Sequence, residues 1–156
     1  MLIRAENIGY EKVKKPTYKF NPHPVDLTDA TMAERCQKVL KKLEEKQLDL
    51  MVIYADREHG ANFSYLTGFE PRFEEAMLVL HRDGTAFLLL GNESMKMEKY
   101  SRIKAKAIHT PYFSLPNQPM EGERDLKEVL EQAGVTSGKK VGVVGWKMFT
   151  SRTEDN

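Results

Sequence analysis

Apolar positions along the chain first predict a helix. From residue 29 to residue 47, apolar side chains recur at every third or fourth position and form one stripe. This pattern is typical of an amphipathic helix. The helix begins either with Thr31 and Glu34 as a capping box or with Thr28 or Asp29 as the cap. The stripe consists of Met32, Cys36, Val39, Leu40 and Leu43.

Short apolar runs further along the chain have the length and composition of buried strands. They are Leu50–Tyr54, Ala76–Leu80, Ala86–Leu90 and Val141–Val144, with Lys104–Thr110 as a weaker fifth. Their apolar residues are continuous rather than alternating, which favours strands that are covered on both faces. Asp83 and Gly84 suit a tight turn between the second and third runs, so we expect these two strands to pair antiparallel.

Two more segments are predicted to be helical and complete the expected fold. Ser94–Ser101 is a short helix capped by Asn92 or Ser94, and Arg124–Ala133 is a helix that ends at Gly134. The resulting order indicates an α/β fold with a mixed, mostly buried sheet of about five or six strands and helices on both faces.

The chain divides into three parts on this basis. We expect an N-terminal arm over residues 1–28, an α/β domain over residues 29–147 and a polar tail or linker over residues 148–156. Residues 1–27 are either a disordered leader or an ordered arm, and the arm has apolar side chains that can pack. These are Ile8, Tyr10, Tyr18 and Phe20.

Composition narrows the class of protein. The chain has 24 basic and 23 acidic residues, so no surplus of positive charge favours nucleic acid as a partner. Cys36 is the single cysteine, which excludes an internal disulfide and any multi-cysteine zinc site. We found no signal peptide and no apolar run near the ~20 residues that span a membrane. We therefore expect a cytoplasmic protein with no membrane contact.

Residues 55–78, ADREHGANFSYLTGFEPRFEEAML, hold the densest group of reactive side chains. Asp56, Glu58 and His59 do not have the spacing of a known metal site, so we predict no metal ion here. Glu74 and Glu75 are adjacent, and neighbours in a strand point to opposite faces. We therefore expect one of these two carboxylates to be exposed and the other to pair with Arg72.

Aromatic and apolar side chains are interleaved with these charges. Leu66 and Phe69 are expected to anchor the segment to the core, and Gly68 to supply a turn conformation that a Cβ would hinder. A rigid, charged loop after a strand is a common place for binding function. The alternative is a helix and turn that lead into the next strand. The late run GKKVGVVGW lacks the G-x-G-x-x-G pattern of a dinucleotide site.

The stretch SYLTGFEPRFEEAMLVL resembles a motif of the N-terminal domain of aminopeptidase P, prolidase and creatinase. Tyr65, Leu66, Thr67, Gly68 and Phe69 match its Tyr-Leu-Thr-Gly-Phe core, and acidic residues and an apolar strand follow as in the family. The order of elements over residues 29–146 is similar as well. The resemblance implies an α/β domain with a mixed sheet flanked by helices.

The resemblance also implies that catalysis belongs to a second, pita-bread domain that this chain lacks. In the peptidases of the family that domain holds two divalent metal ions, Mn, Co or Zn, whereas creatinase works without metal. No position here matches the metal ligands or the catalytic residues. We therefore expect the non-catalytic N-terminal domain of an Xaa-Pro peptidase.

In similar enzymes this domain builds a homodimer or higher homo-oligomer, and its loop reaches a neighbouring subunit's active site. The resemblance thus implies a role in oligomerisation and in shaping the pocket for a peptide or small-acid substrate. The alternative is a self-standing α/β module that binds a small molecule or peptide. The candidate residues near the substrate are Arg57, His59, Asn62, Phe63, Tyr65 and Arg72.

Overall fold

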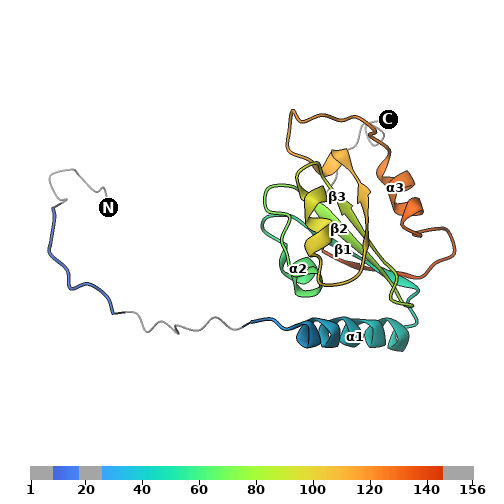
Figure 1. The fold of residues 1–156 in the computed structure, drawn as a ribbon, viewed down its shortest axis with the longest axis horizontal. Helices are drawn as coiled ribbons and strands as arrows, with labels where there is room; N and C mark the ends of the chain where they lie inside the picture. Colours follow the sequence, from blue (N-terminus) through green and yellow to red (C-terminus); the bar gives the residue numbers. More distant parts are fainter. Residues whose placement is uncertain (1–8, 18–25, 146–156) are drawn as a thin grey trace, which may run out of the picture.

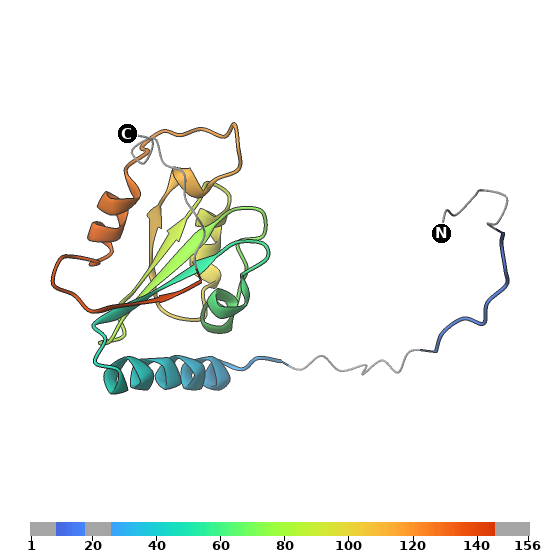
Figure 2. The same cartoon turned by 180° about the vertical axis from the view of Figure 1, so that it is seen from behind.

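The computed structural model describes residues 9–17 and 26–145. Within these residues, helices pack around one sheet, as Figure 1 and, from behind, Figure 2 show. In chain order the elements are α1 (Asp29–Glu45), β1 (Leu50–Ala55), α2 (Ala61–Thr67), β2 (Ala76–His81), β3 (Ala86–Leu90), η2 (Ser94–Tyr100), β4 (Lys106–His109), η3 (Pro111–Phe113), α3 (Leu126–Gln132) and β5 (Val141–Val144).

The sheet is mixed, as the sequence predicts. Its strand order is β4-β3-β2-β1-β5, with five strands among the described residues. β2 pairs antiparallel with both β1 and β3, whereas β1 pairs parallel with β5 and β3 pairs parallel with β4. The predicted hairpin between β2 and β3 is confirmed. Gly84 lies in its turn at φ 89°, a conformation that glycine adopts without steric cost.

Both faces of the central strands are buried, because helices cover each side of the sheet. On one face, Ile53, Ala55 and their neighbours pack with α1 and α2. On the other face, Leu50 and Val52 belong to a second cluster, to which η3 and α3 contribute Phe113 and Val129. Figure 1 shows α2 and α3 on opposite sides of the sheet. The prediction of an α/β fold with helices on both faces is confirmed.

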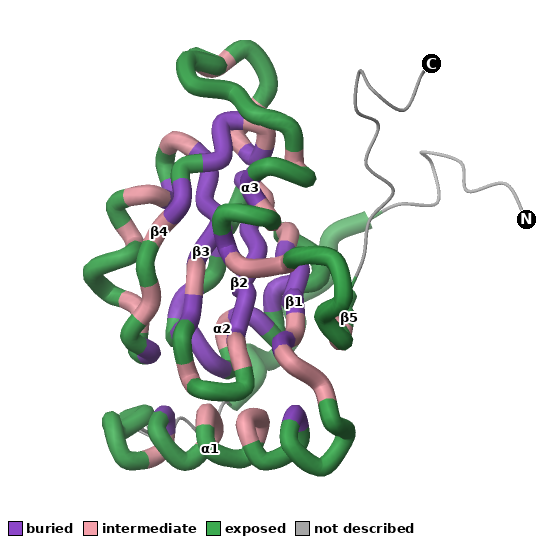
Figure 3. Tube along the Cα trace, turned by 90° about the vertical axis from the view of Figure 1, so that its right-hand side faces the viewer, coloured by how far each residue is buried: buried purple, intermediate pink, exposed green. Residues whose placement is uncertain are grey.

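Strand β5 differs from the prediction of a buried strand. It pairs with β1 and lies at the end of the strand order, and Val143 at its centre is 67% exposed. Figure 3 shows the contrast between β5 and the buried central strands. An apolar run predicts a strand, but it does not reveal whether the strand lies at the centre or the edge of a sheet.

Helix α1 begins at one of the residues predicted to cap it. Thr28 is the N-cap, and its hydroxyl accepts a hydrogen bond from the Thr31 backbone N–H at 3.2 Å. Met32 and Leu43 of the apolar stripe are buried, and the other three residues of the stripe lie against the core. The stripe therefore holds the helix on the sheet.

The N-terminal arm and the C-terminal tail are only partly described. Residues 9–17 contain no helix or strand and are exposed, and Tyr10 makes no packing contact that shields it. Ile8, Tyr18, Phe20, Trp146 and the predicted tail over residues 148–156 lie outside the described residues.

Candidate functional site

Two loop segments meet at one end of the sheet and carry most of the predicted site residues. Residues 56–60 follow β1, and residues 68–75 lead into β2. Because Ala55 at the end of β1 pairs with Ala76 at the start of β2, the two segments leave the sheet side by side. Helix α2 connects them, which confirms the predicted alternative of a helix and turn before the strand.

The Tyr-Leu-Thr-Gly-Phe motif forms the framework of this region. Leu66 and Phe69 are buried in the core, as expected, and Phe69 packs edge-on against Phe63 with ring centroids 5.2 Å apart. The buried Thr67 hydroxyl lies 3.0 Å from the Phe63 carbonyl oxygen and 3.1 Å from that of Phe69. The hydroxyl thus ties the end of α2 to the turn that follows.

Gly68 ends α2 in the left-handed conformation, at φ 79°. A Cβ at this position would overlap the side chain of Arg102, which crosses the turn. The Arg102 backbone N–H also donates to the Thr67 carbonyl at 2.8 Å. The motif therefore needs glycine for two reasons, the backbone conformation and the close approach of Arg102.

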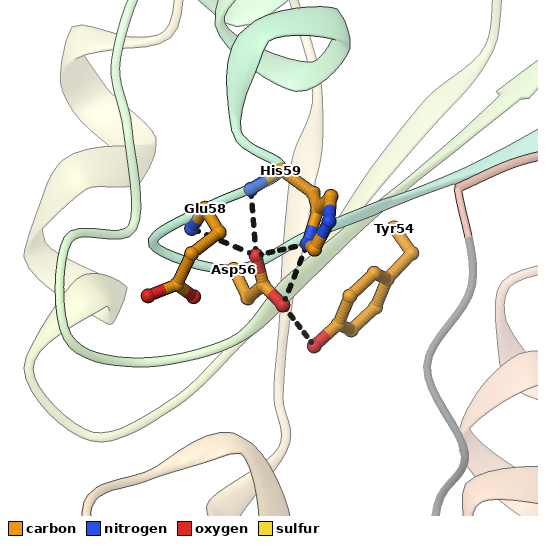
Figure 4. Close-up of polar contacts among 4 residues, drawn as sticks. All are labelled: Tyr54, Asp56, Glu58 and His59. Atoms are coloured by element: carbon orange, nitrogen blue, oxygen red, sulfur yellow. Dashed lines mark hydrogen bonds and ion pairs between the residues drawn. The ribbon is translucent and has the colours of Figure 1, made fainter.

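Asp56 organises the turn after β1 (Figure 4). Its Oδ1 accepts hydrogen bonds from the backbone N–H groups of Glu58, at 2.9 Å, and His59, at 2.7 Å. The same oxygen lies 2.9 Å from Nδ1 of the His59 ring. The Tyr54 hydroxyl approaches Oδ2 at 3.4 Å. The Asp56 side chain is 13% exposed and that of His59 is 67% exposed, so the carboxylate is held inside and the ring faces solvent.

The electrostatics of this cluster follow from burial and from the hydrogen bonds. Burial is the largest single influence on Asp56 and raises its pKa, but the hydrogen bonds from His59 and Glu58 together bring the pKa below its ordinary value. Burial raises the pKa of Tyr54, and the nearby carboxylates of Glu75 and Asp56 raise it further. Asp56 is therefore ionised, and Tyr54 keeps its proton.

Arg57 and Arg72, one from each loop segment, both contact the ring of Phe73. Their guanidinium carbons lie 5.3 Å and 5.9 Å from its centroid, within the range of a cation–π contact. Phe73 is 60% exposed. Neither arginine forms an ion pair or a side-chain hydrogen bond with another described residue. Their N–H donors are thus available to a carboxylate from outside the domain.

Three predicted residues belong to α2 and lie in different surroundings. Tyr65 is 40% exposed, with the Arg35 guanidinium carbon 4.4 Å from its ring centroid, and it lines an open hollow of about 630 Å³ with Arg72. Asn62 is exposed on the same helix. Phe63 is 0% exposed and belongs to the core. The structure therefore brings Arg57 and Arg72 to one ring, exposes His59 in the same turn as Arg57, and places Phe63 in the core.

The expectation for Glu74 and Glu75 is wrong, because neither residue is exposed: Glu75 is half-buried, and Glu74 is buried. Its buried carboxylate accepts hydrogen bonds from the backbone N–H groups of Glu93, at 2.9 Å, and Ser94, at 2.7 Å, rather than pairing with Arg72. Glu74 thereby satisfies the N-terminus of η2, a role that the sequence assigns to Asn92 or Ser94. The glutamate lies 19 positions before Glu93 in the chain, so no local pattern points to it.

Neither a metal site nor a membrane span emerges from the described residues. No three side chains of His, Cys, Asp or Glu within residues 9–17 and 26–145 lie close enough together to hold an ion. The divalent ions of the family's peptidases therefore do not fit the residues described here. No helix in the same ranges is long and apolar enough to cross a membrane.

Comparison with known proteins establishes the family. The family model of the Creatinase/Prolidase N-terminal domain matches residues 35–153, which include the whole motif and the sheet. This chain belongs to that family. The resemblance predicted from the Tyr-Leu-Thr-Gly-Phe stretch is thereby confirmed. No curated protein matches the chain significantly.

Solved structures that are similar to this chain come from proteins of more than one kind. An Xaa-Pro aminopeptidase from Streptococcus pyogenes is 16% identical over 74% of this chain and 93% of its own, with a TM-score of 0.47. The Creatinase/Prolidase N-terminal domain of an X-Pro dipeptidase from the same species is 15% identical over 71% and 99%, with a TM-score of 0.44.

A third similar structure belongs to a different class of protein. The N-terminal domain of the FACT complex subunit SPT16 from chickpea, Cicer arietinum, is 15% identical, with a TM-score of 0.50. The match covers 82% of this chain and 32% of the SPT16 chain. At this identity the likeness shows a shared fold and leaves function to be argued from the site.

Proposed function

We propose that this chain is the non-catalytic N-terminal domain of an Xaa-Pro peptidase-like hydrolase and that it shapes the substrate pocket of that enzyme. Membership of the Creatinase/Prolidase N-terminal domain family supports the class of the parent protein. The chemistry of the described residues supports a role without catalysis, because Asp56, the half-buried carboxylate of the turn, is engaged in holding the backbone of Glu58 and His59.

The observation that carries the pocket role is the pair of arginines around Phe73. Two guanidinium groups converge on one exposed ring without an ion pair among the described residues. The ring limits how far each side chain moves, which lowers the entropy cost of binding an anion. A carboxylate is the anion that a peptide or small-acid substrate offers, and arginine binds it through two parallel hydrogen bonds.

The same surface suits a neighbouring subunit. Exposed aromatic and arginine side chains are enriched at the centres of protein interfaces. We infer a homodimer or higher homo-oligomer in which this end of the sheet faces the active site of another subunit. Catalysis, with two divalent ions of Mn, Co or Zn, then belongs to a further domain, and the parent enzyme acts in the cytoplasm.

The test uses the full-length protein that contains this domain, loaded with Mn²⁺ and assayed on Xaa-Pro dipeptides. We expect Arg57→Ala and Arg72→Ala each to raise KM about tenfold or more, because each variant loses a charged hydrogen bond to the substrate. Arg82→Ala is the matched control. Arg82 is an exposed arginine that follows β2 at the opposite end of the sheet and pairs with Asp49 at 3.4 Å.

The outcomes separate the two parts of the proposal. Absence of Xaa-Pro hydrolysis by the full-length protein would contradict the peptidase assignment. Hydrolysis with an unchanged KM in both arginine variants would refute the pocket role alone. Circular dichroism melts of each variant check that the fold is intact, so that a loss of activity reports on the site.

The alternative is a self-standing module that binds a small acid or peptide through the same arginines. Calorimetry of the 156-residue chain with an Xaa-Pro dipeptide distinguishes the two cases. A self-standing module binds the dipeptide by itself. A pocket wall that is completed by another subunit shows no measurable heat at the same concentrations.

A further inference from the structure

Asp56 and His59 form a hydrogen-bonded pair in the turn that follows β1, within the candidate site. We propose that Asp56 is a positioning residue for His59 and that Nε2 of His59 contacts the free carboxylate of a short substrate, such as a dipeptide. The proposal rests on the function proposed above and names its substrate class. It concerns the imidazole, whereas the arginines around Phe73 carry the pocket role.

The Asp56 carboxylate is fixed before it meets the ring. Two backbone N–H groups, those of Glu58 and His59, hold Oδ1 at 2.9 Å and 2.7 Å. The hydroxyl of Tyr54, which is 2% exposed, approaches Oδ2. A carboxylate with these contacts cannot rotate without losing hydrogen bonds in a place that water barely reaches. Asp56 is therefore a rigid support for the exposed imidazole.

The contact between Asp56 and Nδ1 decides which ring nitrogen faces a ligand. An ionised carboxylate only accepts hydrogen bonds, so the proton of this contact belongs to Nδ1, which lies 2.9 Å from Oδ1 and 3.1 Å from Oδ2. Nε2 is then the ring nitrogen left for a partner, on a side chain that is 67% exposed. With both nitrogens protonated, Nδ1 donates to Asp56 and Nε2 donates to a substrate carboxylate.

The rest of the turn supports a ligand with a free acid. Arg57 lies between Asp56 and His59 in the chain and has no ion pair among the described residues, so one short turn presents the guanidinium of Arg57 beside the imidazole of His59. The Glu58 carboxylate is the acidic group of this turn besides Asp56, and Figure 4 shows it directed away from the His59 ring. The turn therefore favours a dipeptide acid over a peptide whose C-terminal carboxylate is masked.

The experiment compares Ala-Pro with Ala-Pro-amide as substrates of the full-length, Mn²⁺-loaded protein. For the acid, we expect His59→Ala to raise KM about tenfold with kcat within about twofold, because a hydrogen bond to a charged group is lost. Asp56→Asn keeps an oxygen for the two backbone N–H groups but removes the charge beside Nδ1. We expect it to raise KM for the acid about threefold. Neither variant should change KM for the amide.

Glu58→Gln is the matched control, since it removes one negative charge from the same turn and leaves the Asp56–His59 contact in place. The acid-to-amide preference should remain at the wild-type value in this variant. An unchanged preference in His59→Ala while Ala-Pro is still cleaved would overturn the inference and leave the proposed peptidase function standing. Failure of the wild-type protein to cleave either substrate would overturn the proposed function and this inference with it.

Discussion

Replacement of Gly68 by alanine tests the framework that supports the site. The added Cβ meets two obstacles that the structure separates. The backbone is left-handed, at φ 79°, and the side chain of Arg102 occupies the space that the Cβ would take. Arg102 in turn donates to the Leu27 carbonyl oxygen at 2.9 Å and pairs with Asp29, so a shift of its side chain disturbs the start of α1.

The expected loss of stability is the sum of the two effects. Left-handed backbone costs an alanine about 1–2 kcal/mol relative to glycine. Displacement of Arg102 removes one hydrogen bond, worth about 1 kcal/mol. Its ion pair adds little, because the Asp29 side chain is 99% exposed. We therefore expect Gly68→Ala to lower the free energy of unfolding by about 2–3 kcal/mol, on the order of a 1 M shift in the urea midpoint.

Urea unfolding of the 156-residue chain measures this loss, and Gly84→Ala is the matched control. Gly84 has a similar φ of 89°. A Cβ added there would lie 3.9 Å from its nearest atom, Leu40 Cδ1, which is an ordinary contact. Gly84→Ala should therefore show the backbone cost alone. Arg102→Ala should lower the free energy of unfolding by about 1 kcal/mol less in the Gly68→Ala background than in the wild type. Equal losses for the two glycine variants would refute the argument from Arg102.

Two further predictions concern buried and half-buried carboxylates. Glu74→Gln should cost about 1–3 kcal/mol, since its amide leaves one buried N–H of η2 without an acceptor, and the exposed Glu93→Gln should cost less than about 0.5 kcal/mol in the same urea assay. Equal losses would contradict the capping role. The lowered pKa of Asp56 stabilises the fold above the ordinary aspartate pKa of about 3.9, and this contribution is lost as pH falls through the folded-state pKa. The melting temperatures of wild type and Asp56→Asn should therefore converge at acidic pH. A difference between them that persists there would contradict this contribution of Asp56.

The sequence predicts the sheet well because burial on both faces leaves a simple signal. β1, β2 and β3 lie under helices on each side, so their apolar runs are continuous, and the Asp83–Gly84 turn fixes the hairpin between β2 and β3. A continuous apolar run does not predict the exposure of Val143. It depends on which strand ends the sheet, and that is a property of the whole topology.

The cap of η2 was mispredicted for a related physical reason. Capping rules search the residues next to a helix, where Asn92 and Ser94 are good candidates. The carboxylate that accepts these hydrogen bonds comes from Glu74, two residues before β2, and it reaches η2 because β2 and β3 are neighbours. Long-range contacts of this kind are set by strand pairing, so they become predictable only once the order of the strands is known.

Within the candidate site, the sequence separates surface from core only partly. Arg57, His59 and Arg72 are charged residues of one loop, and their exposure follows from their charge. Phe63 could have been assigned to the core, because Phe63, Leu66 and Thr67 recur at helical spacing and form the buried face of α2. Phe73, the ring that receives both arginines, carries no such signal, since it follows Arg72 at φ 61° in an irregular turn.

These observations divide the loop region into a framework and a rim. Leu66, Thr67, Gly68 and Phe69 make contacts within the domain, and a domain of this fold also occurs in a protein of another class, a FACT complex subunit. Function must then depend on side chains that the framework presents but does not use. We propose that in this chain they are Arg57 and Arg72 around Phe73, and His59 held by Asp56. A change in the framework should act through stability, whereas a change in the rim should alter ligand choice in a domain that remains folded.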